Sequence, residues 1–234
     1  MTDWKFRVTD IPRNTELLSG LKPHDIDLIL AAGRPRRFPA KSVMTYQGEP
    51  AEHFLLLWKG RARFFYDTNR EQKLILKWLT PGDCFGEAAL LSEARPTYLV
   101  GTEAVSDSIV VEWSHETIRA LVCRYPLVLE NVLRIDMSYL SWYVSDHAAL
   151  FSEKARQRLV SVLVRLATKF GQKVSGGIEL DVTNEELAES ANITRYTTSR
   201  LMSEWQKSGT IRKRKGKILL RSAEGPFFLL ISLL

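Results

Sequence analysis

The sequence predicts an α+β protein that consists of an N-terminal antiparallel β-roll, a long helix and a C-terminal winged helix-turn-helix. Three observations predict this fold. Short apolar or alternating runs divided by turn residues fill residues 37–113, as is typical of a small antiparallel barrel or roll. One helical pattern then runs without interruption through residues 126–150. The last third of the chain contains two capped helical patterns separated by a tight turn and followed by a basic hairpin.

Composition excludes several classes of protein. The chain has 234 residues, and none of its apolar runs reaches the length of a membrane-spanning helix. The N-terminal stretch MTDWKFRVTD has an early acid and no long apolar core, so we expect no signal peptide, a cytoplasmic location and no membrane partner. The two cysteines, Cys84 and Cys123, and the four scattered histidines predict no metal site. No catalytic motif is present, so we expect no enzyme.

The charge is concentrated at one end of the chain. Residues from Phe151 onward carry a net charge of +7, whereas the preceding residues sum to −1. A near-neutral part joined to a basic part is typical of a regulatory domain that carries a polyanion-binding domain. A solvated basic surface is the alternative, and charge alone does not decide between the two.

The predicted roll follows two short helical pieces in residues 15–31, which are broken around Gly20 and Pro23. After the roll, Ser114 is expected to cap a helix with Thr117 in its first turn. Ser152 is expected to cap a further helix that runs to about Phe170. The strands of the roll are expected at residues 43–46, 54–58, 61–66, 74–79, 98–100 and 109–113.

The long helix has two apolar seams. One seam can pack on the roll, and the other needs a second surface, for which an identical helix of another subunit is the simplest choice. We therefore expect a homodimer, with a helix buried on two sides within one chain as the alternative. One seam consists of Leu129, Leu133, Leu140, Tyr143 and Leu150, and the other of Val128, Val132, Ile135, Tyr139 and Trp142.

Residues 183–209 predict two helices joined by a tight turn. Thr183 and Glu186 form a capping box at the start of the first helix. Asn192 stands where the turn needs a left-handed backbone, and Thr194 is placed to cap the second helix, which ends at Ser208-Gly209. The buried face of the second helix is expected to consist of Thr198, Leu201, Met202 and Trp205.

The second helix directs polar side chains outward at its start, which is where a helix-turn-helix contacts base edges in the major groove. Arginine pairs with guanine, and Thr and Ser contact phosphate or base. The basic hairpin that follows predicts a wing that binds phosphate, and the alternative of a purely structural helical hairpin leaves that wing unexplained. The candidate DNA-binding residues are Thr183, Thr194, Arg195, Tyr196, Thr197, Ser199, Arg200, Arg212, Lys213, Arg214, Lys215 and Lys217.

The order of these features resembles the Crp/Fnr family of bacterial transcription regulators over roughly residues 17–220. The matching pieces are YQGEPAEHFLLL at 46–57, GRAR at 60–63, PGD at 81–83, FGEAALL at 85–91, the long helix and the polar start of the second helix. The resemblance implies a cyclic-nucleotide-binding-like sensing roll at 1–124, a dimerisation helix at 125–151 and a DNA-binding domain at 152–234. It also implies a palindromic operator in double-stranded DNA, with RNA polymerase as a candidate partner. Arg195, Ser199 and Arg200 match the family's reading positions, whereas Tyr196 departs from the Glu of many members.

The same resemblance points to a candidate effector pocket. Family members that bind cyclic AMP pair a Gly-Glu with a downstream Arg-Ser/Thr, and Gly86-Glu87 is present here. Arg95 precedes a proline, however, and Thr97 stands ten residues after Glu87, so we expect an effector site that does not bind cyclic AMP in the usual way. The effector and any cofactor stay unassigned. The pocket residues are Gly86, Glu87, Ala88, Arg95, Thr97 and Tyr139.

Two alternative functions and one odd segment complete the sequence reading. A cyclic-nucleotide-responsive regulator with a divergent phosphate pocket at Glu87 and Arg95 is one alternative. A cupin-like small-molecule enzyme is the other, but its strands would need clustered His or carboxylate ligands, which are missing here. The apolar tail at 226–234 is too short to span a membrane and is expected to pack against the protein.

Overall fold

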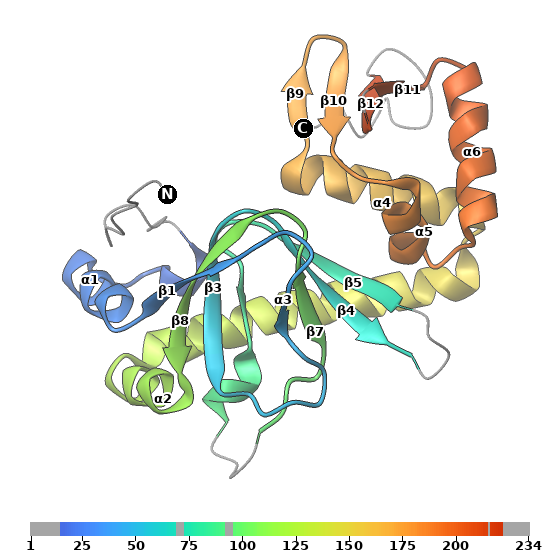
Figure 1. Ribbon diagram of the computed structural model, residues 1–234. Helices are drawn as coiled ribbons and strands as arrows, with labels where there is room; N and C mark the ends of the chain where they lie inside the picture. Colours follow the sequence, from blue (N-terminus) through green and yellow to red (C-terminus); the bar gives the residue numbers. More distant parts are fainter. Residues whose placement is uncertain (1–14, 69–72, 92–95, 215, 222–234) are drawn as a thin grey trace. The chain divides into compact units, whose positions relative to one another are not determined.

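The computed structural model describes residues 15–68, 73–91, 96–214 and 216–221 (Figure 1). The chain packs as two compact units, one formed by residues 1–72 and 76–142 and the other by residues 73–75 and 143–234. The division falls within one continuous helix, α3 (Pro126–Ser152). The domain bounds expected from the sequence remain a prediction, and the C-terminal tail at 226–234 lies outside the described residues.

The first unit contains the predicted antiparallel roll, built from two four-stranded sheets. One sheet has the order β1-β8-β3-β6, with β1 at Arg34–Phe38, β8 at Ser108–Ser114, β3 at His53–Lys59 and β6 at Cys84–Phe85. The other has the order β2-β7-β4-β5, with β2 at Val43–Thr45, β7 at Gly101–Ala104, β4 at Ala62–Asp67 and β5 at Lys73–Leu79. Apolar side chains from both sheets form one buried cluster, so the core of the roll lies between them.

One strand expected from the sequence is wrong. Residues 98–100 are irregular, and the strand lies one step later, at β7. The Tyr98 hydroxyl instead donates to the carbonyl of His53 at 2.9 Å, which fixes this stretch as a loop against β3. The sequence also missed β1, because four of its five residues are exposed and give no apolar alternation.

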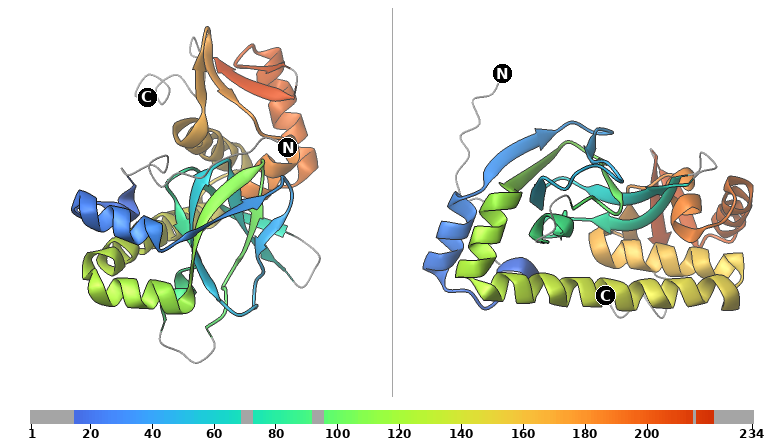
Figure 2. Two further views of the ribbon diagram at one scale, coloured as in Figure 1. Left: turned by 60° about the vertical axis from the view of Figure 1, so that its left-hand side comes forward. Right: turned by 90° about the horizontal axis from the view of Figure 1, so that it is seen from below.

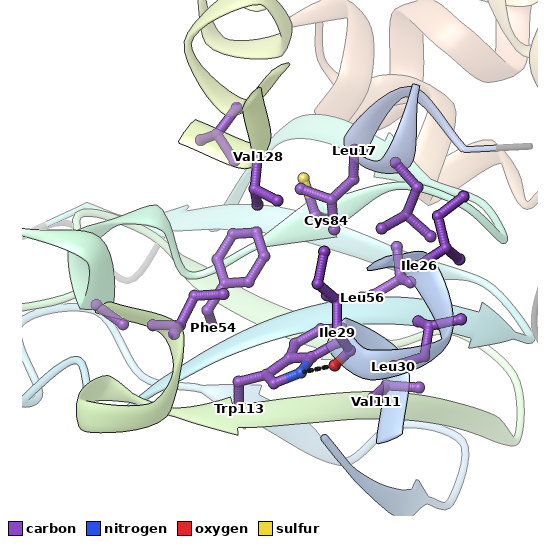
Figure 3. Close-up of a cluster of buried hydrophobic side chains, with 14 of the residues drawn as sticks. Leu17, Ile26, Ile29, Leu30, Phe54, Leu56, Cys84, Val111, Trp113 and Val128 are labelled. Carbon is purple, nitrogen blue, oxygen red and sulfur yellow. Dashed lines mark hydrogen bonds between the residues drawn. The ribbon is translucent and has the colours of Figure 1, made fainter. Parts of the chain in front are cut away.

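Helices cover the outer face of the first sheet. The short helices η2 (Glu16–Leu18) and α1 (Pro23–Ala31) confirm the broken helical pieces, and α2 (His115–Arg124) begins with the Ser114 hydroxyl accepting from the Thr117 amide. Figure 2 shows α1 and α2 side by side at one end of this sheet. Their apolar faces join β3, β8 and the first turns of α3 in a second buried cluster, in which the Trp113 indole donates to the Ile29 carbonyl at 2.8 Å (Figure 3).

The second unit contains the last part of α3, from Tyr143 to Ser152, and a small mixed domain. Its helices are α4 (Ala155–Phe170), α5 (Asn184–Ala191) and α6 (Arg195–Lys207). Its sheet has the order β11-β12-β10-β9 and is antiparallel throughout, with β9 at Gln172–Val174, β10 at Gly177–Leu180, β11 at Ile211–Arg214 and β12 at Lys217–Arg221. This is the three-helix, winged arrangement that the sequence predicted.

The expected cap at Ser152 is wrong. Helix α3 continues through Ser152, whose hydroxyl donates to the Ala148 carbonyl one turn earlier. Helix α4 starts after Lys154, and the Gln157 side chain reaches back to accept from the Lys154 amide at 2.9 Å. A serine hydroxyl can bond within its own helix as readily as it caps the next one, so the pattern was ambiguous. None of the helices in the described part of the chain has both the length and the hydropathy needed to cross a bilayer.

Candidate nucleic-acid interface and roll site

The turn between α5 and α6 is specified by local hydrogen bonds. The Thr183 hydroxyl accepts from the Glu186 amide at 3.2 Å, and the Thr183 amide donates to the Glu186 carboxylate at 2.8 Å. Asn192 ends α5 with a φ of 48°, the left-handed conformation that asparagine tolerates. The Thr194 hydroxyl then accepts from the Thr197 amide and caps α6. The capping box, the turn and the second cap are all confirmed.

Helix α6 has a buried face and an exposed face. Thr198, Leu201, Met202 and Trp205 are buried, as the sequence predicted. The opening turns therefore direct Arg195, Tyr196, Ser199 and Arg200 to the surface, and Thr197 is half-buried. Tyr196 is 79% exposed, so an aromatic ring stands where many family members have a carboxylate. The exposed face has the geometry that a recognition helix needs.

Both exposed arginines of α6, Arg195 and Arg200, form ion pairs with carboxylates. Arg195 forms an ion pair with Glu185 of α5. Arg200 pairs with Glu204 one turn later at 2.6 Å, and the second oxygen of Glu204 pairs with Arg156 of α4. The sequence reading missed these acids. The Arg200–Glu204 spacing of four residues was a readable signal, but the pairs with Glu185 and Arg156 join different helices.

The wing is a tight basic hairpin. Arg212 and Lys213 on β11 are exposed, and Gly216 makes the turn with a φ of 79°. Lys217 on β12 is already engaged, since its ammonium lies 2.6 Å from the Glu179 carboxylate on β10. Arg214 belongs to β11, whereas the side chain of Arg214 and the whole of Lys215 lie outside the described residues.

In the roll, Gly86 positions the candidate effector residue Glu87. Gly86 has a φ of 86°, and a Cβ there would lie 2.6 Å from the His53 carbonyl oxygen, so the chain has room only for glycine. Glu87 opens the short helix η3 (Glu87–Leu90), and Ala88 packs against the core beside it. Burial, helped by the carboxylate of Asp136 on α3, raises the pKa of the Glu87 carboxyl to about 7.

Two further candidate pocket residues, Tyr139 and Thr97, differ in their environment. Tyr139 of α3 meets the Phe64 ring edge-on at 6.3 Å, and the Lys77 ammonium lies 4.9 Å from the centre of its ring. Thr97 is exposed and forms an isolated bridge with Pro50. Arg95 lies outside the described residues.

The sequence reading missed part of this roll site. Lys77 stands ten residues before Glu87 and Asp136 stands 49 residues after it, and the fold brings their charges close enough to act on the Glu87 carboxyl. Burial likewise raises the pKa of Asp136, and Lys77 lowers it. No local motif signals this grouping, because its members come from β5, η3 and α3.

One side of α3 is exposed and apolar. Leu129, Leu133, Met137 and Leu140 are between 39% and 63% exposed, and Tyr143, Val144 and Phe151 continue the stripe. The other seam is occupied within the chain: Val128 and Val132 are buried in the core of the first unit and Ile135 packs against it. Tyr139 and Trp142 are half-buried and stack on each other. The described residues bring together no group of three His, Cys, Asp or Glu side chains that could hold a metal.

Comparison with protein families gives two matches. Residues 35–125 match the cyclic nucleotide-binding domain, and residues 157–225 match the Crp-like helix-turn-helix domain. The cyclic AMP receptor protein of Thermus thermophilus is 28% identical over 90% of this chain and 94% of its own length. A CRP-like cAMP-activated global transcriptional regulator of Mycobacterium tuberculosis is 22% identical over 89% of this chain and 93% of its own length.

Solved structures share the fold. The c-di-GMP-responsive regulator CLP of Xanthomonas campestris superposes with a TM-score of 0.76 at 21% identity, covering 86% of this chain and 99% of CLP. The catabolite activator protein of Thermus thermophilus gives a TM-score of 0.53 at 28% identity, covering 92% of this chain and 96% of its own. The first likeness, at its low identity, supports the fold alone.

Proposed function

Because this chain belongs to the Crp/Fnr family of transcription regulators, and is therefore no enzyme, we propose that it is a homodimer that reads a palindromic operator. The cupin-like enzyme considered from the sequence is set aside on the same ground. Each subunit would place α6 in one major groove, with the two half-sites about one helical turn, ~34 Å, apart. We further propose a cytoplasmic location and RNA polymerase as a partner, in keeping with a regulator of transcription.

The observation that carries this proposal is the exposed start of α6. Arg195 and Arg200 are exposed in the first two turns of α6, and the opposite face of this helix is buried. Arg212 and Lys213 extend the positive surface to the wing. Arginine can read guanine bidentately, and wing cations neutralise phosphate. We therefore propose base reading by α6 and phosphate contact by β11.

The proposed dimer rests on the exposed stripe of α3. A second copy of the same stripe would cover Leu129, Leu133, Met137 and Leu140 by coiled-coil packing. Exposed apolar patches of this kind mark interaction surfaces in proteins that fold in water. A symmetric pair of subunits also matches a two-fold operator.

For the roll, we propose an effector site that does not hold cyclic AMP in the usual way. Thr97 is exposed and cannot supply the cation that a cyclic phosphate requires. Glu87 and Asp136 place two carboxyls near one lysine, which disfavours an anionic ligand. The Tyr139 ring, which contacts both Phe64 and Lys77, takes up further space near this lysine. Cyclic AMP is the competing effector, because the names of the relatives include it. In that alternative, Glu87 and Arg95 would form a divergent phosphate pocket.

Selection of bound sequences from random duplex DNA tests the proposal, with purified protein in the absence of ligand and again with cyclic AMP or cyclic GMP. We expect a two-fold palindrome in every arm. A matched variant, Arg200→Ala, should relax one base position in each half-site. Enrichment only with cyclic AMP would contradict the proposed roll site and leave DNA reading intact. No enrichment in any arm would contradict ligand-independent reading, and a non-palindromic site would contradict the dimer.

A further inference from the structure

The first unit has a cavity that is separate from the roll site. It has a volume of about 570 Å³ and lies between the N-terminal helices and α3. Its apolar wall is formed by Leu18, Leu21, Ile26 and Ile135. Pockets of this size with apolar walls and a few polar groups hold small organic molecules. Neither Glu87 nor Tyr139 of the candidate effector pocket is part of its lining.

A buried asparagine organises the polar end of this cavity. Asn131 of α3 is 1% exposed, and its amide donates to the carbonyls of Leu17 at 3.0 Å and Ser19 at 2.8 Å. Its oxygen accepts from the Arg134 guanidinium at 3.0 Å. All three hydrogen bonds fix the asparagine, so it holds the guanidinium at the cavity. Arg134 is the cation of the lining.

Residues with hydroxyl groups also line the cavity. The Thr15 hydroxyl has no hydrogen-bond partner, although Thr15 is 6% exposed and belongs to the lining. The hydroxyl oxygen itself is enclosed by protein atoms, so Thr15 contributes its position in the wall and not a hydrogen bond to a ligand. The Ser138 hydroxyl donates to the Arg134 carbonyl and keeps acceptor capacity.

The cavity and the exposed stripe occupy different sides of α3. At 100° per residue, Asn131 and Ser138 lie about 100–160° around the helix from Leu133 and Met137, whereas Arg134 lies about 100° from Leu133 and about 60° from Met137. A second subunit packed on the stripe would therefore not face Asn131 or Ser138, and Arg134 would lie at the edge of that contact. The site does not depend on the proposed function.

We propose that this cavity binds a small monocarboxylate with an apolar body. The carboxylate would pair with Arg134, and the apolar body would lie against the wall formed by Leu18, Leu21 and Ile26. Arg134 now pairs with Glu130 at 2.8 Å, but both side chains are more than 60% exposed, so this pair is weak and a ligand can displace it. The carboxylate of Glu16 at the rim disfavours a second negative charge on the ligand.

Ligand-observed NMR titrations test this site with octanoate, 1-octanol and octylamine, which share one chain and differ in the head group. We expect saturable binding of octanoate, with 1-octanol and octylamine weaker by about tenfold. Arg134→Gln should weaken octanoate by about tenfold and leave 1-octanol unchanged. Arg124→Gln, which removes an exposed arginine from the last turn of α2, is the control and should bind octanoate as the unmodified protein does.

Three results would overturn the assignment. If octanoate shows no saturable binding, the proposed site does not exist. If octanoate and 1-octanol bind equally, the carboxylate is not recognised by its charge. Equal losses in Arg134→Gln and Arg124→Gln would attribute binding to general positive charge. Circular dichroism of both variants establishes that they are folded, since neither arginine is buried.

Discussion

At the scale of single residues, Arg200 is the best candidate for reading a base. Replacing it by alanine should cost about 1–3 kcal/mol in operator binding and relax one position in the half-site. Electrophoretic shifts on the selected site and on its single-base variants measure both effects. Lys213→Ala is the contrast: it should weaken all sequences alike and flatten the salt dependence. If Arg200→Ala instead lowers the affinity for every DNA sequence equally, Arg200 contacts phosphate and does not read a base.

Glu204 is expected to govern how Arg200 is used. Its carboxylate engages Arg200 and Arg156 together, which orients the guanidinium and opposes nearby phosphate. Glu204→Gln should therefore tighten binding to random DNA by about twofold, since an exposed pair is worth about 0.5 kcal/mol. The ratio of specific to random binding should fall. Asp181→Asn removes the same charge from an exposed site of this unit and is the control. If the ratio of specific to random DNA binding is unchanged in Glu204→Gln, Glu204 does not position Arg200.

At the scale of elements, the exposed stripe of α3 makes the dimer testable. Leu133 is 56% exposed and lies in the middle of the stripe. Leu133→Arg should give a monomer by light scattering, with a folded circular dichroism spectrum, because two arginines would face each other across a symmetric seam. Leu99→Arg is the matched control, since Leu99 is 82% exposed on the roll. A Leu133→Arg protein that stays dimeric would place the interface elsewhere.

Features of the helices and strands that depend on local hydrogen bonds could be predicted from the sequence, whereas those set by tertiary contacts could not. Asn192 and the caps at Thr183 and Thr194 were readable because each depends on bonds within three or four residues. Residues 98–100 and Ser152 were misread because tertiary contact decides the first and two competing local bonds decide the second. Strand β1 was missed since its pairing with β8, not its own composition, makes it a strand.

At the scale of the whole molecule, one candidate site could be predicted from local sequence pattern, whereas two others are assembled only in the folded chain. The face of α6 followed from helical periodicity, so its reading residues could be predicted. The roll site could not, because Lys77, Glu87 and Asp136 come from three elements and interact only in the folded chain. The cavity on α3 likewise needs Asn131 to meet the carbonyls of Leu17 and Ser19 across more than a hundred residues.

The buried carboxyl of Glu87 should set a pH dependence for the stability of the roll. Its pKa rises from an ordinary value of 4.5 to about 7 on folding, so the folded chain binds more protons than the unfolded chain between these values. The free energy of unfolding should therefore fall as pH rises from about 4.5 to 7, and stay level above. Asp136, whose pKa burial also raises, adds to the same trend.

Glu87→Gln keeps the shape and removes the titration. It should be more stable than the unmodified protein at pH 8, by about 2 kcal/mol, and should lose most of the slope between pH 5 and 7. Denaturant unfolding at several pH values measures this, followed by tryptophan fluorescence, because Trp113 lies in the core of the same unit. Glu49→Gln, an exposed carboxylate of the roll, should keep the full slope. A Glu87→Gln protein with an unchanged slope would mean that the carboxyl is already ionised in the fold, with Lys77 as its stabilising charge.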